Sequence, residues 1–538
     1  MNSKTKTIKS GAALAAGLLL LSGCNPAPKY AKPPATTPTA FKEAPEQFKE
    51  GAGWKLAQPG DDKIRAKWWE IYNDPQLNAL EEQVAIGNQS IAAAEANYRS
   101  ARALVVSARS NLYPTIGASP TYANSRQSAT TRSTAVQSTG GGSLSSVTNG
   151  WNIPFDVSYT ADFWHRIRNA IDAQVYSAQA SAADVATALL SIQSELATDY
   201  FELRASDAQR QILTDTIENY RQALQLTTIL FRTGIDSEQD VTQAQTQLDT
   251  TIAEATDVGV ARSQFEHAIA TLMGKPASNF ELPVGKFDPN PPQIPVAVPS
   301  ILLERRPDIA ALERQVAAAN SEIGIARAAY YPSLTLSASG GLQTSHITQW
   351  FTWPSRTWSV GPALSQTLFD GGARRAQNEQ ANAQYDAAVA NYRQTVLTSF
   401  QGVEDQLSTL RILSQEVVQQ RTALASANHY LDLAQTRYKT GVDSYLNVIT
   451  AQTAVLTDRV TELSIQLRQM SSSVSLIMAL GGGWDPAQLP QKKDMLARPG
   501  PWQQNAPVPN AQPGNTPPGA VNPPPLPPKP ASAAPNGQ

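Results

Sequence analysis

One stretch of this chain occurs twice, and this repeat constrains the fold more than any other feature. Residues 232–246 and 439–453 both carry a helical pattern that runs into Thr-Gly, then Asp-Ser, then Ala-Gln-Thr. A glycine at the end of a helix suits a left-handed C-cap, and Asp-Ser offers an N-cap for the next helix. We therefore expect each copy to be the tip of a helical hairpin.

The repetition extends well beyond the two tips. Leu112–Ser119 recurs as Tyr330–Ser337, and Leu272–Gly274 recurs as Ala479–Gly481, in the same order relative to the tips. A duplication of this size indicates one architecture built from two similar halves. The boundaries we expect are 75–285 for the first repeat and 286–484 for the second.

Charge and composition exclude several classes of function. The net charge is −2 and no long basic run occurs, which argues against nucleic-acid binding. The four histidines are far apart, the chain has one cysteine, and the sequence contains neither a nucleophile elbow nor a phosphate loop. We therefore expect no enzyme, no catalytic residues, no metal and no soluble cofactor.

The first residues have the layout of a secretory signal peptide. Lysines precede an apolar run from Gly11 to Leu21, which is too short to span a bilayer. The run ends in Leu21-Ser-Gly-Cys24, which resembles a bacterial lipobox and implies cleavage after a 1–23 signal peptide and acylation of Cys24. Asn25 follows where an aspartate would favour the inner membrane, so the resemblance points to the outer membrane.

Two segments outside the repeats lack any hydrophobic periodicity. Residues 24–74 are rich in Pro, Ala, Lys and Thr and are expected to form an extended strap from the lipid anchor. Residues 485–538 are dense in proline and are expected to be a disordered tail.

Each repeat carries two stretches with an alternating pattern. A helix predicted from Asp74 ends at Tyr113-Pro114, and apolar residues then alternate over 115–122 and 151–160. Similar alternation occupies 334–339 and 357–368 in the second half. Strands of about ten residues with one apolar face match transmembrane β-strands, and tryptophans cluster near their ends. We expect one transmembrane hairpin per repeat; a small soluble sandwich is the alternative.

The remaining windows predict unusually long helices. No proline occurs in 155–275 or in 363–485, and each window carries about 70 residues of helical pattern, or about 100 Å. Four strands cannot close a barrel, and open edges in lipid leave backbone groups unpaired. Two copies would give eight strands with a filled interior, and three would give twelve with a lumen. The predicted fold is an α+β membrane protein in which several copies close a barrel that the helices continue on the periplasmic side.

Four motifs resemble those of a known family. Leu303–Asp308 (LERRPD), Ile323–Pro332, Leu368–Gly372 and Arg437–Leu446 resemble the TolC-like outer-membrane factors, in their OprM-like lipoprotein branch, the NodT family. The resemblance covers residues 65–484. It implies a trimeric 12-stranded barrel continuous with a coiled-coil periplasmic tunnel, in a lipid-anchored homotrimer of the outer membrane of a Gram-negative bacterium. The trimer would export drugs or small toxic compounds passively, with a periplasmic adaptor and an inner-membrane RND-type transporter as partners.

The same resemblance and the helical spacing suggest site residues. Gly234, Ser237, Gly441 and Ser444 match the tip motif that contacts the adaptor, and Tyr438 and Leu446 match the closed periplasmic entrance. Asp443, Leu446 and Thr450 are spaced to share one helix face, and a threefold axis would turn each into a ring. We expect Leu446 to form an apolar constriction. Asn447 and Thr450 stand where the family often has acids, which leaves Asp443, Asp236, Glu238 and Asp240 as candidates for entrance charge.

Two other functions use similar elements. A conduit for polypeptide secretion by a type I system would have the same fold, but the lipobox and LERRPD motif favour small-molecule efflux. A lipid-anchored coiled-coil spacer without a pore would explain the long helices and leave the two hairpins unexplained.

Overall fold

The computed structural model describes residues 25–38, 41–43, 67–126, 147–292, 294 and 305–496. The predicted signal peptide, Cys24 and most of the predicted proline-rich tail lie outside these residues. In the described part, no helix combines the length and the apolar character needed to cross a bilayer.

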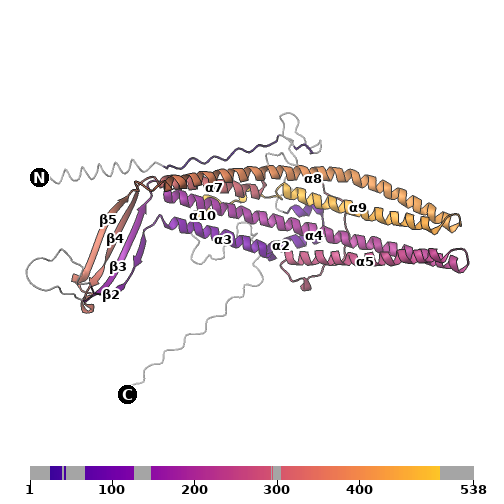
Figure 1. Ribbon diagram of the computed structural model, residues 1–538, viewed down its shortest axis with the longest axis horizontal. Helices are drawn as coiled ribbons and strands as arrows, with labels where there is room; N and C mark the ends of the chain where they lie inside the picture. Colours follow the sequence, from indigo (N-terminus) through magenta and orange to yellow (C-terminus); the bar gives the residue numbers. More distant parts are fainter. Residues whose placement is uncertain are drawn as a thin grey trace, which may run out of the picture. The chain divides into compact units, whose positions relative to one another are not determined.

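Two pairs of long antiparallel helices form the body (Figure 1). Helix α4 (Arg166–Arg232) returns as α5 (Glu238–Leu272), and α8 (Ala373–Lys439) returns as α9 (Tyr445–Ala479). The outgoing helices have 67 residues each and the returning ones 35 each. At 1.5 Å per residue the outgoing helices are about 100 Å long. The predicted long hairpins are confirmed, and each tip stands about 100 Å from the start of its outgoing helix.

Shorter helices complete the body between its middle and the sheet (Figure 1). They are α2 (Pro75–Gly87), α3 (Gln89–Ser110) and α7 (Pro307–Ala328). The prediction of one unbroken helix up to Tyr113 is wrong, because the chain breaks at Asn88. The Asn88 Oδ1 accepts hydrogen bonds from the backbone N–H groups of Ser90 and Ile91 at 2.8 and 3.1 Å, so it caps α3.

The break at Asn88 brings α2 against the end of α5. The Asn88 amide donates to the Leu272 carbonyl at 2.9 Å. A Cβ on Gly87 would lie 2.4 Å from the Met273 carbonyl oxygen, so only glycine permits this approach. The first element of the repeat is thereby tied to its last.

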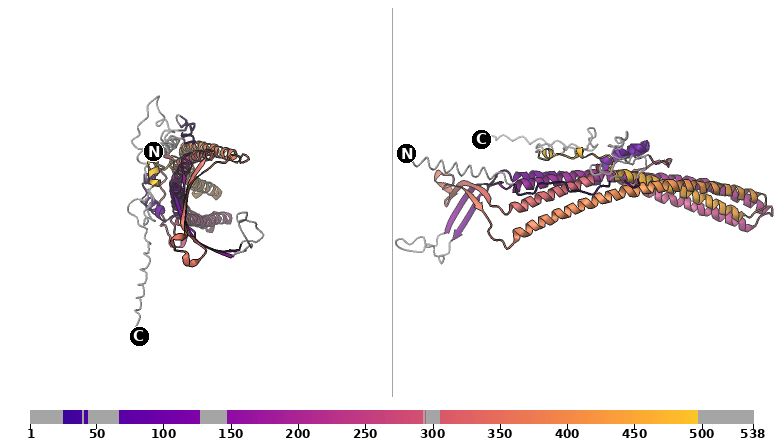
Figure 2. Two further views of the ribbon diagram at one scale, coloured as in Figure 1. Left: turned by 90° about the vertical axis from the view of Figure 1, so that its left-hand side faces the viewer. Right: turned by 90° about the horizontal axis from the view of Figure 1, so that it is seen from above.

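All strands join one antiparallel sheet at the end of the helices opposite to the tips, and the sheet is curved (Figures 1 and 2). The strands pair in the order β1 and β2, then β3, β4 and β5. Their bounds are β1 Thr115–Ala118, β2 Thr121–Arg126, β3 Val147–Ala161, β4 Ser333–Thr344 and β5 Arg356–Ser365. The expected strand over 115–122 is broken at Ser119-Pro120, where proline has no N–H to donate.

The two predicted hairpins are joined to each other by their central strands. β3 pairs with β4 from Trp151 opposite Thr344 to Ala161 opposite Leu334. Gly341 is required there, since a Cβ would lie 2.2 Å from the Ile153 carbonyl oxygen. The outer edges of β1, β2 and β5 have no strand partner among the described residues.

A hydrophobic core fills the middle of the body, where the short helices meet the long ones. A 3-10 helix, η3 (Trp68–Tyr72), buries Trp68 and Trp69 there. The predicted strap therefore ends before Trp68 and not at residue 74. Its described residues follow α7 and α8: Asn320 donates to the Pro28 carbonyl at 3.0 Å, and Glu404 accepts from the Lys42 N–H at 2.7 Å.

A buried ionic cluster holds the connection between the repeats. The Asp207 carboxylate accepts hydrogen bonds from Arg204 Nη1 at 2.9 Å, Arg262 Nε at 2.7 Å and the Gly285 N–H at 3.1 Å. Arg204 also donates to the Pro283 carbonyl at 2.9 Å. Arg204 and Asp207 are both buried, where an unpaired charge would be unfavourable. Asp207 provides the counter-charge for Arg204 and also pairs with Arg262.

The LERRPD motif closes the second repeat. Pro307 starts α7, and the Arg306 guanidinium is held by Asp308 at 2.7 Å while it donates to the Ala479 carbonyl at 2.8 Å. A cation at the carboxyl end of α9 satisfies a free carbonyl and complements the helix dipole. The motif therefore fixes the end of α9 to the start of α7.

The ordered chain extends past the predicted end of the second repeat. Pro486–Gln488 forms η7 and Lys492–Leu496 forms α10. Lys492 pairs with Asp172 at 2.5 Å, Gln179 donates to the Pro490 carbonyl at 2.8 Å, and Met495 is buried. The prediction that disorder begins at residue 485 is wrong for these residues, because they have partners on α4.

Candidate site at the helical tips

Both tips turn through a glycine with positive φ. Gly234 has φ 77° and Gly441 has φ 71°, which confirms the predicted left-handed caps. The Ile235 N–H donates to the Leu230 carbonyl at 2.9 Å, and the Val442 N–H donates to the Arg437 carbonyl at 2.9 Å. These bonds satisfy carbonyls at the ends of α4 and α8.

The two tips start their return helices differently. At the first tip the Ser237 hydroxyl accepts from the Asp240 N–H at 3.3 Å and donates to the Asp240 carboxylate at 2.7 Å. At the second tip Ser444 occupies the N-cap position, but its side chain makes no capping bond. The N-cap predicted for each Asp-Ser pair therefore forms through the Ser237 side chain at the first tip, whereas at the second tip Ser444 occupies the N-cap position without a side-chain capping bond.

Asp443 organises the second tip in place of the serine. Its Oδ1 accepts from the Ser444 N–H at 2.9 Å and from the Asn447 amide at 2.5 Å, and its Oδ2 lies 3.2 Å from Arg437 Nε. These contacts lower the pKa of Asp443, with the Asn447 hydrogen bond as the largest cause. Asp443 is thus an ionised carboxylate held within its own tip.

Tyr438 connects the second hairpin to the first. Its hydroxyl donates a hydrogen bond to the Asp236 carboxylate of the first tip and lies 3.4 Å from the hydroxyl of Thr227 on α4. Its ring is buried and lies 5.2 Å from the ring of Tyr445. Burial, followed by the hydrogen bond to Asp236, raises the pKa of Tyr438. The hydroxyl therefore stays protonated and able to donate.

Tyr445 and Thr227 complete this contact and were not predicted. Burial raises the pKa of Tyr445 to about 12, and Thr227 is fully buried. The repeat itself carries a signal for Tyr445, since the equivalent position of the first repeat is Glu238. An aromatic residue in place of a charged one indicates a side chain that is buried against the other hairpin.

The remaining predicted entrance residues lie on the first turns of α5 and α9. Leu446 is 55% exposed and borders a groove between α5 and α9 with Glu238, Gln239 and Thr242. The Thr450 hydroxyl donates to the Leu446 carbonyl at 2.9 Å, so Thr450 follows Leu446 on one face. The Asp240 carboxylate accepts a hydrogen bond from Ser237 within the first tip, and the Asn447 amide donates to Asp443 within the second.

The four residues expected to touch a partner are accessible. They are Gly234, Ser237, Gly441 and Ser444. No group of His, Cys, Asp and Glu side chains in the described ranges is placed to hold a metal ion. The tips therefore combine an exposed surface with the Tyr438–Asp236 hydrogen bond that joins the two hairpins.

Comparison with known proteins identifies the family. The model of the outer membrane efflux protein family matches residues 80–275 and 298–482. The chain belongs to the outer membrane efflux protein family. It is an outer-membrane protein of a transport family and not of an enzyme family.

Relatives extend along nearly the whole chain. The solvent efflux pump outer membrane protein SrpC of Pseudomonas putida is 30% identical over 480 residues, which cover 88% of this chain and 98% of that protein. The outer-membrane channel OprN is 26% identical with a TM-score of 0.76, covering 86% of this chain and 100% of OprN. The open state of the Neisseria gonorrhoeae MtrE outer membrane channel is 25% identical with a TM-score of 0.71, covering 86% and 99%. The predicted resemblance is confirmed, and these relatives do not favour a secretion conduit.

Proposed function

We propose that this protein is the outer-membrane channel of a tripartite efflux pump, a passive conduit that carries drugs or other small toxic compounds from the periplasm to the exterior. One observation carries the proposal: a sheet whose two edges have no strand partner in the described part of the chain lies at the end of two hairpins about 100 Å long. The names of the efflux relatives supply the class of transport.

Closure of the sheet requires further copies of the chain. The five described strands of the protomer occupy four positions in the sheet, because β1 and β2 both pair with β3 and together form one edge, while β5 forms the other. Each unpaired backbone group in hydrocarbon is unfavourable by several kcal/mol, so the two edges are expected to pair with neighbouring protomers. Three copies give the twelve strands that leave an open lumen. We therefore propose a homotrimer.

The outward surface of the sheet suits lipid. Trp358 on β5 is 77% exposed, and Val360 and Leu364 follow on alternate positions with similar exposure. Aromatic rings gather at both ends of the strands: Trp151 lies 4.9 Å from Trp350 at one end, and Trp164 stacks 4.5 Å from Tyr331 at the other. Aromatic belts of this kind mark the two faces of a membrane.

The chain near Cys24 lies where an acyl chain would reach the same membrane. The Asn169 amide donates to the Asn25 side chain at 3.2 Å, and Asn169 is in the first turn of α4, next to the sheet. This position supports the proposal that Cys24 carries a covalent lipid. The barrel and the lipid would then anchor the protein together.

The tips are the proposed contact with the pump. A periplasmic adaptor, fed by an RND-type inner-membrane transporter, would bind the exposed residues Gly234, Ser237, Gly441 and Ser444. The entrance would open when the second hairpin moves away from the first and separates Tyr438 from Asp236. Leu446 is proposed as the apolar constriction on the threefold axis, with Asp443 and Thr450 beside it.

Purified protein in planar lipid bilayers tests this function. A trimeric barrel should give discrete conductance steps and run as a trimer in native mass spectrometry. The gene can also be returned to a strain from which it has been deleted. Restored tolerance of solvents and drugs, without restored secretion of a polypeptide, would identify small-molecule efflux. A monomeric protein that leaves the bilayer current unchanged would contradict the channel.

A further inference from the structure

The described strands carry few charges, and the positive ones lie at one end of the sheet. Arg126 and Arg356 are the basic residues of these strands, and Asp156 is the acidic one. Arg126 ends β2 and Arg356 begins β5, so both lie at the end of the sheet remote from the helices (Figure 1). We call this end, residues 122–126, 147–151 and 344–356, the outer rim. Its sequence contains no aspartate or glutamate.

The pairing register places both arginines on the apolar face of the sheet. Directly opposed residues of antiparallel strands share a face. Arg356 is opposite Leu342, which is opposite Ile153 on β3. Arg126 is opposite Val147, an even number of positions from Ile153 on the same strand. Both arginines therefore extend the face that is proposed above to meet lipid.

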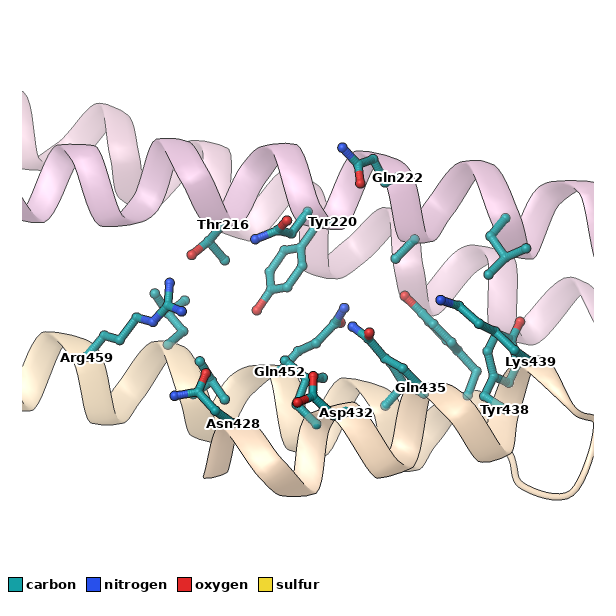
Figure 3. Close-up of a pocket in the computed structure, with 18 residues that line it drawn as sticks. Thr216, Tyr220, Gln222, Asn428, Asp432, Gln435, Tyr438, Lys439, Gln452 and Arg459 are labelled. Atoms are coloured by element: carbon teal, nitrogen blue, oxygen red, sulfur yellow. The ribbon is translucent and has the colours of Figure 1, made fainter. Parts of the chain in front are cut away.

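The acidic residue of the strands is on the other face. Asp156 is an odd number of positions from Ile153, and successive side chains of a strand alternate between faces. Charge is distributed differently between the two helical hairpins, where residues of both signs, Asp432, Lys439 and Arg459, line one space (Figure 3). The outer rim is thus distinguished by charge of a single sign on a lipid-facing surface.

Arg356 is held against an aromatic ring. Its guanidinium carbon lies 3.7 Å from the centre of the Trp353 ring, and Trp353 is 77% exposed. The turn that presents the pair is fixed by hydrogen bonds, since the hydroxyls of Thr352 and the buried Ser355 donate to the Gln349 carbonyl at 2.6 and 2.7 Å. The pair is therefore arranged before any ligand binds, which lowers the entropy lost on binding.

The surroundings of this pair match the depth of lipid headgroups. Trp350 lies 4.9 Å from Trp151 of β3 and 5.5 Å from Phe351, which is 78% exposed. Aromatic side chains gather at the level of the headgroups in membrane proteins. Trp353 and Arg356 belong to the same turn, so they lie at the depth where lipids carry their phosphates.

We propose that Trp353 and Arg356 bind the phosphorylated sugar headgroup of a glycolipid in the outer leaflet. The planar guanidinium matches two phosphate oxygens and donates to both, while the indole ring covers the adjacent sugar. The proposal rests on the membrane barrel proposed above, which places the outer rim at the external surface. A glycolipid is the suitable ligand because its headgroup offers a ring for Trp353 as well as an anion for Arg356.

The proposed trimer would strengthen this site at each junction between protomers. The free edge of β5 would adjoin the β1 and β2 edge of the next copy, with neighbouring strands about 4.8 Å apart. β2 ends and β5 begins at the outer rim, so the neighbouring copy's Arg126 would lie on the strand next to Arg356 and on the same face. Its charge adds to the attraction for an anionic headgroup.

Lipid titration followed by native mass spectrometry tests binding by the purified detergent-solubilised protein. The probe is diphosphoryl lipid A, with lipid A lacking both phosphates and phosphatidylglycerol as matched lipids. We expect diphosphoryl lipid A to bind about tenfold more tightly than either. Equal binding of the two forms of lipid A would overturn the phosphate contact, and equal binding of phosphatidylglycerol would overturn the assignment to a glycolipid. Displacement by equimolar inorganic phosphate would overturn the lipid as the ligand.

Substitutions locate the site. Arg356→Gln and Trp353→Leu should each weaken lipid A binding about tenfold, and Arg356→Lys, which keeps the charge and loses the planar fork, should bind at an intermediate level. Arg221→Gln is the matched control, because Arg221 is an exposed arginine of α4 that lies remote from the sheet and pairs with Glu218. Wild-type affinity in both Arg356→Gln and Trp353→Leu would remove the site.

Bilayer recordings separate this proposal from the channel function. Arg356→Gln should conduct as the wild type does, because Arg356 is on the face turned away from the lumen. A conducting protein whose Arg356→Gln variant binds lipid A normally would overturn the headgroup site and leave the channel standing. A protein that binds lipid A through Arg356 and never conducts would contradict the channel and leave the headgroup site standing.

Discussion

The Tyr438 hydroxyl on α8 donates a hydrogen bond to the Asp236 carboxylate at the tip of the other hairpin. The two residues are far apart in the chain, and each stands at the end of a 67-residue helix. The bond therefore joins the two repeats at the point where the proposed entrance must open. A hydrogen bond to a charged acceptor contributes about 1.5 to 3 kcal/mol.

Replacing Tyr438 by phenylalanine should loosen the entrance. The ring would still pack on Tyr445, but Asp236 would lose its donor, so bilayer conductance and entry of large antibiotics should rise. Tyr392→Phe is the matched control, since the buried Tyr392 hydroxyl has no hydrogen-bond partner in the described chain. A Tyr438→Phe channel with wild-type conductance would show that this bond does not hold the entrance closed.

The same bond should resist alkaline pH. Burial and Asp236 raise the pKa of Tyr438 above its ordinary value of 10.0. A group whose pKa is raised on folding contributes stability that is complete below the unfolded pKa and is lost as the pH rises through the folded one. Conductance measured from about pH 7 to about pH 9 should therefore show no opening from this link. An increase over that interval that disappears in Tyr438→Phe would contradict the assignment.

Leu446 and Thr450 should affect the channel in different ways. Leu446→Ala removes most of an exposed apolar side chain and should widen the constriction, raising single-trimer conductance. Thr450→Asp adds a ring of charge and should chiefly increase cation preference and block by multivalent cations. If Leu446→Ala left conductance unchanged while Asp240→Ala opened the channel, acidic links of the first tip would hold it shut.

Much of this architecture could be predicted from the repeat and the period of the apolar residues. The hairpins, their glycine caps and the strand pattern depend on local chemistry, which the sequence displays directly. One failure lies where a distant partner decides. Asn88 breaks a helical pattern because the Leu272 carbonyl of another helix accepts its amide N–H. The second tip is a local choice between two adjacent polar side chains: Asp443, and not Ser444, accepts the hydrogen bonds there. The cross-hairpin partner of Tyr438 could not be assigned before the two tips were placed side by side.

Removing the carboxylate of Asp207 should destabilise the body more than any tip substitution. Asp207→Ala leaves the buried Arg204 without its counter-charge, and breaking a buried ion pair is unfavourable by about 3 to 5 kcal/mol. Thermal unfolding of the purified protein measures the loss. Asp215→Ala on the same helix is the control, since its carboxylate is exposed and accepts a hydrogen bond from the nearby Gln211 at 2.8 Å. Equal melting temperatures for the two variants would show that the cluster is dispensable.

Cys24→Ser should separate the two proposed anchors. The variant should no longer be labelled by radioactive fatty acid. It should still assemble in the outer membrane through its barrel, although it loses the acyl chain, whose insertion contributes about 0.8 kcal/mol per buried methylene to membrane binding. Membrane fractionation and native gels report both properties. A wholly soluble variant would argue that the sheet does not hold the protein in the bilayer.

The equal lengths of α4 and α8 limit how this sequence can evolve. An insertion of one residue into either helix moves its tip by about 1.5 Å and turns it by about 100°. Tyr438 would then no longer face Asp236 unless the other helix gained a residue at the same level. An insertion or deletion in α4 should therefore be accompanied by one of the same length in α8. The lengths of the two helices should change together in evolution, while their surface residues change independently.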